Sequence, residues 1–204
     1  ETLECRECPL RTLPEGHWPL LRLLDLRATE LQSLPSSVSR LPALRQLKVD
    51  DTPLRSLPEG SYSCLEELWA SRTSLLSLPL AIIGPELRIC QLERNGLKEI
   101  PDSLSSAVRL RDLNASENKL SDLPDLSGLS ELRTLSLRGN NFTELPNSIT
   151  RLPSLTRLDL SANRLERLPQ GIESLPKLEY LELSNNLLAA LPKHPWANVR
   201  GEGN

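Results

Sequence analysis

The residues of this chain that could do chemistry are few and are poorly placed for it. Cys5 and Cys8 have the Cys-x-x-Cys spacing of redox and metal sites, but no second Cys or His pair follows them. The two histidines, His17 and His194, stand near opposite ends of the chain. No serine lies in a nucleophile-elbow motif, and the nine glycines form no phosphate-binding motif. We therefore expect no catalytic residue, no metal site and no cofactor.

The composition argues against several classes of partner. A formal net charge of −3 disfavours nucleic acid and anionic membrane as main partners, since both require a clustered basic surface. The longest purely apolar run, residues 187–191, is far shorter than the ~20 residues of a membrane span. The chain begins within a recurring pattern and shows no signal peptide, so we expect a fragment or a processed product.

One leucine pattern recurs from end to end and accounts for most of the 48 leucines. Its form is Leu-x-x-Leu-x-Leu-x-x-Asn-x-Leu-x-x-Leu-Pro, and its cleanest copies begin at Leu155 and Leu178. Nine copies, the first of them partial, start near residues 1, 21, 44, 65, 87, 110, 132, 155 and 178. A fixed period of this length is the mark of a repeat architecture.

Each part of the pattern predicts a local structure. The Leu-x-Leu alternation has period two, which predicts a short strand with both leucines pointing inward. The Leu-x-x-Leu-Pro step leaves that period and turns the chain, which then returns as 3₁₀, polyproline-like or irregular backbone. A single copy cannot bury its one apolar edge, whereas stacked copies form a continuous leucine core beneath a parallel sheet.

The ninth position of the pattern divides the chain into two parts. There a carboxamide can bond backbone groups of neighbouring turns that would otherwise be buried unpaired. The later copies carry Asn95, Asn118, Asn140, Asn163 and Asn186, and the first four carry Cys8, Thr29, Thr52 and Thr73. We expect the amino-terminal half to be less tightly held, the alternative being a segment tuned for binding.

The four cysteines replace core or partly buried residues of the repeat. Cys5 and Cys90 occupy inward leucine positions, Cys8 occupies the ninth position, and Cys64 ends a return segment. This placement predicts reduced thiols packed in the core. Reduced thiols indicate a reducing compartment, or delivery into one.

The pattern resembles intracellular leucine-rich-repeat proteins of the class with roughly 23 residues per repeat. That class includes Ras-scaffold proteins, plant intracellular Ras-group proteins and the repeat domains of plant-pathogen type III effectors. The resemblance covers residues 3–192 and implies an α/β, right-handed solenoid with its parallel sheet on the concave face and 3₁₀ or irregular segments on the convex face. Residues 8–14, the threonines at the ninth position and the arginine-rich composition resemble the effector repeats most closely.

The register also predicts the domain limits and the ends. Residues 1–192 form the repeat domain, and residues 193–204 form a carboxyl-terminal cap or tail. Trp18 and Trp196 stand where they could cover the two exposed ends of the core. The glycine-containing segment 200–204 is predicted to be disordered.

Outward-facing strand positions predict where a partner binds. Trp69 is the outlier among them, because it stands between the inward Leu68 and Ala70, and exposed tryptophans are frequent interface anchors. The alternative is that Trp69 folds sideways over its own sheet and covers Ala70. The predicted contact residues are Leu23, Lys48, Asp50, Trp69, Arg72, Ile89, Gln91, Glu93 and Arg94.

These observations predict a monomeric protein-protein interaction module without enzymatic activity or a small-molecule substrate. The first hypothesis is the target-recognition domain of a bacterial effector, which would be secreted into the cytoplasm of a host cell. A eukaryotic cytosolic signalling scaffold is the second. The third is the recognition arm of a ubiquitin ligase whose catalytic domain lies outside this chain.

Overall fold

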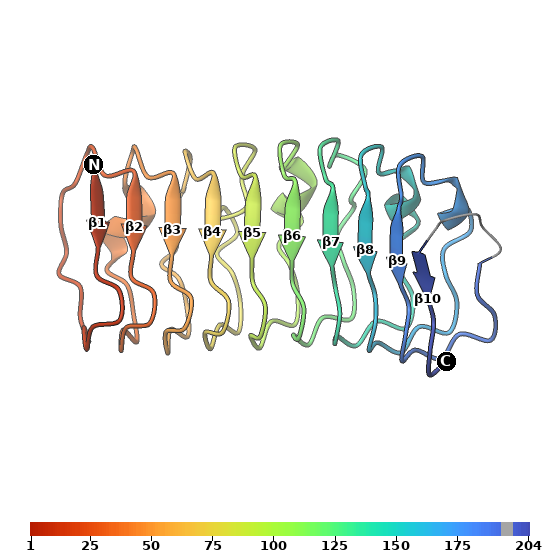
Figure 1. Ribbon diagram of the computed structural model, residues 1–204. Coiled ribbons are helices and arrows are strands. Elements are labelled where there is room, and N and C mark those ends of the chain that lie inside the picture. The colour runs from red at the N-terminus through yellow and green to blue at the C-terminus, as the bar shows by residue number, and fades with distance from the viewer. Residues whose placement is uncertain (193–197) are drawn as a thin grey trace.

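Ten short parallel strands form one sheet in the computed structural model, which describes residues 1–192 and 198–204 (Figure 1). They are β1 (Thr2–Glu4), β2 (Leu23–Asp25), β3 (Gln46–Lys48), β4 (Glu67–Trp69), β5 (Ile89–Gln91), β6 (Asp112–Asn114), β7 (Thr134–Ser136), β8 (Arg157–Asp159), β9 (Tyr180–Glu182) and β10 (Asn198–Arg200). Each strand pairs in parallel with the next strand along the chain. Every turn of the chain therefore adds one strand beside the last, which confirms the predicted solenoid.

In the described part of the chain, four 3₁₀ helices interrupt the return segments behind the sheet. They are η1 (Ser36–Arg40), η2 (Asp102–Ser106), η3 (Asn147–Arg151) and η4 (Ile172–Ser174). Three of them begin directly after the proline of a Leu-Pro or Ile-Pro step, where the missing N–H of proline leaves no donor unpaired. The other return segments in the described part of the chain have irregular backbone, as the sequence predicted.

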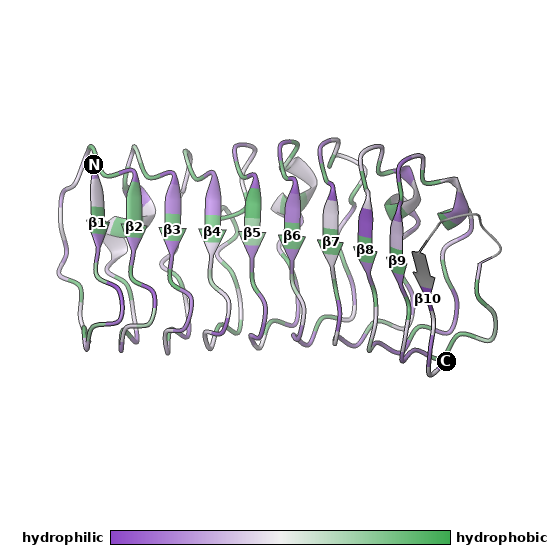
Figure 2. Cartoon of the chain, in the orientation of Figure 1, coloured by the Kyte–Doolittle hydropathy of each residue, from purple (hydrophilic) through white to green (hydrophobic). Residues whose placement is uncertain are grey.

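The centre of the core contains a column of inward residues from successive strands. Leu24, Leu47, Leu68, Cys90 and Leu113 lie on successive strands in register, and all are almost completely buried. Apolar residues also appear on the outward side of β2 and β5, which Figure 2 colours mostly green. Because each strand contributes only three residues, the stability of the sheet depends on stacking of the turns.

The ninth-position asparagines tie neighbouring turns together. Asn118 donates from Nδ2 to Leu92 O at 2.9 Å in the preceding turn, and its Oδ1 accepts from Leu97 N at 3.1 Å. Thr29 and Thr52 instead donate only within their own turns, at 2.8 and 2.7 Å. The substitution of threonine for asparagine therefore removes hydrogen bonds between repeats from the amino-terminal half.

A residue with left-handed backbone precedes the ninth position of each repeat. Among residues 1–192 and 198–204, the ten with φ between 51° and 77° are Glu7, Ala28, Asp51, Arg72, Arg94, Glu117, Gly139, Ala162, Asn185 and Gly203. Only two of them are glycine, although this conformation is unfavourable for other residues. Since the strain occurs in every turn, it belongs to the geometry of the solenoid and does not mark a binding site.

Ala162→Gly is expected to raise the free energy of unfolding by about 0.5 to 1 kcal/mol, because glycine adopts a left-handed backbone conformation without a Cβ penalty. Ala162 has a φ of 53° and its side chain is only half-buried, so little packing is lost. Urea denaturation measures the change. Ala115→Gly is the control, since Ala115 is fully buried and has no positive φ, and it should destabilise the fold. Destabilisation by both changes would contradict the argument.

The two ends differ in how they relate to the predictions. Trp18 is partly buried and packs against the core beside the first turn, as expected. The prediction of a disordered segment 200–204 is wrong, because the chain returns to the sheet there. Leu183 N donates to Arg200 O, and Asn185 N donates to Glu202 O, each at 2.8 Å.

A tenth turn explains this order at the carboxyl-terminal end. Asn204 donates from Nδ2 to Leu183 O at 3.2 Å and to Gly201 O at 2.8 Å. The ninth-position asparagines of the earlier repeats donate in the same pattern. The turn is short, because Val199 pairs with Leu181 only 18 residues earlier in the chain. The predicted cap Trp196 and the second histidine, His194, lie outside the described residues.

Candidate functional site

All nine predicted contact residues lie on four neighbouring strands, β2 to β5, or in the turns that follow these strands. Lys48, Trp69 and Gln91 occupy equivalent positions on β3, β4 and β5, so their side chains stand side by side on the outer face of the sheet. Leu23 and Ile89 begin β2 and β5 and are half-buried. The repeat register therefore brings the nine residues together on one part of the sheet, and their contact with a partner stays a prediction.

Trp69 is half-buried, with its polar edge held by its own strand. Its Nε1 donates to Glu67 Oε2 at 2.9 Å, and Lys48 Nζ lies 5.6 Å from the centre of the ring. Glu67 also lies 3.9 Å from Lys48 Nζ. The indole is therefore outside the leucine core and is held in one orientation by the neighbouring charges.

A small hollow opens beside the tryptophan, with a volume of about 250 Å³. It lies over the carboxyl ends of β3, β4 and β5. Its lining residues are Arg27, Asp50, Asp51, Trp69, Ser71, Arg72, Gln91 and Glu93. Five of the nine predicted contact residues thus converge on one feature, and Leu23, Lys48, Ile89 and Arg94 lie outside its lining.

Ion pairs between repeats neutralise most charges at the rim. Arg72 donates from Nε and Nη2 to Asp51 at 2.6 and 2.7 Å, and this hydrogen bonding lowers the pKa of the Asp51 carboxyl. Arg94 donates from Nε to Glu117 Oε2 at 2.8 Å and lies 3.6 Å from Glu93. The arginines at this edge of the sheet are therefore already engaged.

Asp50 is the exception among the carboxylates of the hollow. Its exposed fraction is 6%, and its Oδ1 accepts from Ser71 N at 2.9 Å. Burial raises the pKa of Asp50 above its ordinary value, despite that hydrogen bond and the charges of Arg27 and Arg72. Nothing in the sequence around Asp50 indicated that its side chain would be buried.

Two features of the sheet face were missed by the sequence reasoning. The first is the burial of Asp25, which is covered by Arg6 and Arg27, each 2.8 Å from its Oδ2. Burial by itself would raise the pKa of Asp25, but hydrogen bonds from Arg27 and the positive charges outweigh it and lower the pKa. The side chain therefore serves as a buried counter-ion that fixes two arginines over the first turns.

The second is a larger polar hollow near the carboxyl-terminal end, of about 580 Å³. Its lining is Arg138, Asp159, Ser161, Tyr180, Glu182, Ser184, Asn185, Arg200 and Glu202. Tyr180 is held there by the Arg157 guanidinium, 4.8 Å from the ring centre, and by a 3.1 Å hydrogen bond to Glu182. The tenth turn contributes two of the lining residues, Arg200 and Glu202. A repeat pattern that ends at residue 192 therefore does not predict this hollow.

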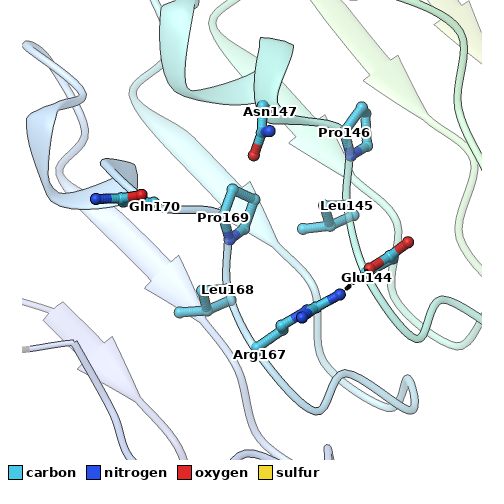
Figure 3. A pocket seen from close by; sticks show the side chains of 8 residues that line it. All are labelled: Glu144, Leu145, Pro146, Asn147, Arg167, Leu168, Pro169 and Gln170. Carbon is cyan, nitrogen blue, oxygen red and sulfur yellow. Dashed lines mark hydrogen bonds and ion pairs between the residues drawn. The ribbon is translucent and has the colours of Figure 1, made fainter.

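A further depression lies away from the sheet face, between two successive Leu-Pro steps (Figure 3). Glu144, Leu145 and Pro146 line one side, and the equivalent residues of the next repeat line the other. Arg167 spans it and pairs with Glu144 at 2.7 Å. This depression is the gap between two stacked turns, and its only charged groups neutralise each other.

The cysteines are unpaired thiols. Cys90 is fully buried, and this burial raises the pKa of its thiol to about 12, which keeps it protonated and unreactive. Cys8 Sγ donates to Cys5 O at 3.7 Å. Within residues 1–192 and 198–204, no group of three or more His, Cys, Asp or Glu side chains is arranged to hold a metal ion. No helix in this part of the chain has the length and apolarity to cross a membrane.

Comparison with known proteins supports the identification of the repeat. Residues 130–188 match the family model described as leucine rich repeat, and residues 108–150 match the model for two copies of leucine rich repeats. A 70-residue stretch is 39% identical to transforming growth factor beta activator LRRC32 of Mus musculus, covering 33% of this chain and 11% of that protein. Another, of 68 residues, is 41% identical to a leucine-rich repeat and calponin homology domain-containing protein of Drosophila melanogaster, covering 32% and 8%. The matched stretches thus span about a tenth of each relative's length.

Solved structures extend the likeness over most of the chain. A leucine-rich-repeat protein of Leptospira interrogans superposes with a TM-score of 0.69 at 28% identity, covering 83% of this chain and 50% of that one. The plant peptide hormone receptor RGFR1, solved in complex with RGF2, gives 0.74 at 28% identity, covering 83% and 29%. A TDR receptor gives 0.75 at 28% identity, covering 90% and 35%. With the family matches and the solenoid geometry, these likenesses show that the chain contains a leucine-rich-repeat domain.

Proposed function

We propose that this domain is a non-catalytic, monomeric module that holds a protein partner against the concave sheet face, with Trp69 as the anchor. The observation that carries the proposal is the half-buried indole beside a hollow, flanked by the half-buried Leu23 and Ile89 and by charges of both signs. An aromatic anchor with an apolar margin and a polar rim is the usual composition of a protein interface.

The structural neighbours support binding as the role of the fold. RGFR1 was solved with RGF2 bound, so a solenoid with similar geometry can hold a peptide or protein ligand. Solenoids present extended surfaces on which outward side chains vary freely, since the core positions alone maintain the fold.

The biological setting belongs to the same proposal. The repeat form at residues 8–14 and the arginine-rich composition favour a bacterial effector that recognises its target in a host cell. The four free thiols favour a reducing compartment such as the cytosol. A eukaryotic signalling scaffold and the recognition arm of a ubiquitin ligase are the alternatives, and a secretion segment or a catalytic domain in the flanking sequence would distinguish the three.

Trp69→Ala is expected to weaken partner binding by about 2 kcal/mol or more, because removal of an anchor leaves its contact area empty. The partner is first identified by affinity purification with the wild-type domain, and its dissociation constant is then measured by calorimetric titration. Tyr180→Ala is the matched control, an aromatic residue on the same face at β9. Unchanged affinity for Trp69→Ala would remove Trp69 from the site, and a larger loss for Tyr180→Ala would contradict its role as the anchor.

A further inference from the structure

We propose that the hollow beside Trp69 receives an arginine or lysine side chain of the protein partner, whose positive charge pairs with the carboxylate of Asp50. The inference rests on the proposed function, because it assigns the chemistry of one contact on the same face. It follows from the charges around the hollow, the isolation of Asp50 among them, and the aromatic wall that Trp69 supplies.

The carboxylates around Asp50 already have cations. Asp51 is bonded by Arg72 at 2.6 and 2.7 Å, and Glu93 lies 3.6 Å from Arg94. In contrast, no lysine or arginine nitrogen of the described chain lies within 4 Å of the Asp50 carboxylate. Its hydrogen bond from Ser71 N occupies Oδ1. Asp50 is thus the one carboxylate of this hollow without an ionic partner in the described residues.

Burial makes this isolation costly. The residue Asp50 is only 6% exposed, so its carboxylate loses hydration, and backbone N–H groups such as that of Ser71 replace only part of it. The two nearest guanidinium groups cannot turn to it without cost, since Arg27 is held by Asp25 and Arg72 by Asp51. A cation that enters from the partner would supply the missing positive charge. In the free protein, burial raises the pKa of Asp50, because the buried carboxylate lacks such a charge.

The walls of the hollow suit an elongated cation. Trp69 lines one side, and aromatic faces attract guanidinium and ammonium groups, arginine most often. Gln91 offers a carbonyl oxygen as an acceptor. Three carboxylates stand against two guanidinium groups in the lining, so the hollow favours a positive group. A volume of about 250 Å³ is smaller than most small-molecule sites, and it fits a single side chain.

The test uses the whole domain and two probes that differ only in charge. N-acetyl-arginine amide and its neutral isostere N-acetyl-citrulline amide are titrated while NMR follows the indole N–H of Trp69. We expect saturable shifts with the arginine probe in the millimolar range and binding at least about tenfold weaker with the citrulline probe. Asp50→Asn should weaken binding of the arginine probe at least about fivefold. Asp112→Asn, which removes one negative charge from the same face outside the hollow, should change it less than about twofold.

Three results would overturn the inference. They are equal binding of the two probes, no saturable shift up to about 50 mM arginine probe, and unchanged binding by Asp50→Asn. The probe comparison uses only the wild-type domain, so it decides the question even if Asp50→Asn folds poorly. Partner binding that depends on Trp69 while the arginine probe fails would sink this inference and leave the proposed function standing. If the arginine probe binds but no partner binds in a way that depends on Trp69, the proposed function fails and the affinity of the hollow for a cation stands.

Discussion

Phe142→Ala is expected to lower the free energy of unfolding by about 3 to 5 kcal/mol, the loss typical of a buried phenylalanine truncated in a core. Phe142 is the only phenylalanine of the chain and one of the largest fully buried side chains. It occupies the position that Leu120 and Leu165 hold in the adjacent turns. Its removal would leave a cavity between two turns whose backbones are fixed by hydrogen bonds. Urea denaturation followed by circular dichroism gives the change.

Phe142→Leu is the matched control, because it restores the residue that the other repeats carry at this position. We expect it to cost roughly 1 to 2 kcal/mol, since most of the cavity is filled again. A cost below about 1 kcal/mol for Phe142→Ala would mean that the turns are free to collapse onto the cavity. The continuous leucine core described for the solenoid would then be too loosely packed.

Asn140→Ala is expected to cost about 2 to 4 kcal/mol, because buried backbone groups in two turns lose their partners at once. Asn140 Oδ1 accepts from Leu120 N at 3.0 Å, and its Nδ2 donates to Ala115 O and Leu137 O, each at 2.9 Å. Alanine satisfies none of these groups, and at 6% exposure water has little access to them. The measurement is again the midpoint and slope of urea denaturation.

Thr52→Ala is the comparison, because Thr52 occupies the same ninth position in an earlier repeat. Thr52 donates one hydrogen bond, to Val49 O at 2.7 Å in its own turn, so its loss should cost about 1 kcal/mol. The difference between the two variants measures what the asparagine contributes between repeats. Equal costs would contradict the idea that the threonine-bearing turns are the less tightly connected ones.

The core positions could be predicted because they follow a strict period. Leu68 and Leu113 were assigned inward from spacing alone, and both lie buried in register on β4 and β6. The bonding role of Asn118 was likewise predicted, since the bend needs a side chain that reaches backbone groups of neighbouring turns. In a solenoid these assignments depend on nearest neighbours, which the repeat supplies directly.

For the site, the register predicted the positions of the residues and not the partners of their side chains. The register placed Trp69 and Gln91 side by side, and it placed Asp50 near them. It could not show that Asp50 is buried without a cation, because that depends on which neighbour each arginine chooses. Arg72 turns to Asp51 and Arg27 to Asp25, and these choices are rotamer and distance effects that no spacing encodes.

By itself, then, the sequence determined the solenoid, its parallel sheet and the face on which each strand residue lies, because repeated burial of leucine leaves one workable register. Only the tertiary structure decided the tenth turn, where Val199 and Gly201 stand in leucine positions after a short return and backbone pairing with β9 fixes the chain. It also decided the hollow beside Trp69. Outward side chains carry no packing constraint, so their arrangement emerges only when neighbouring turns meet.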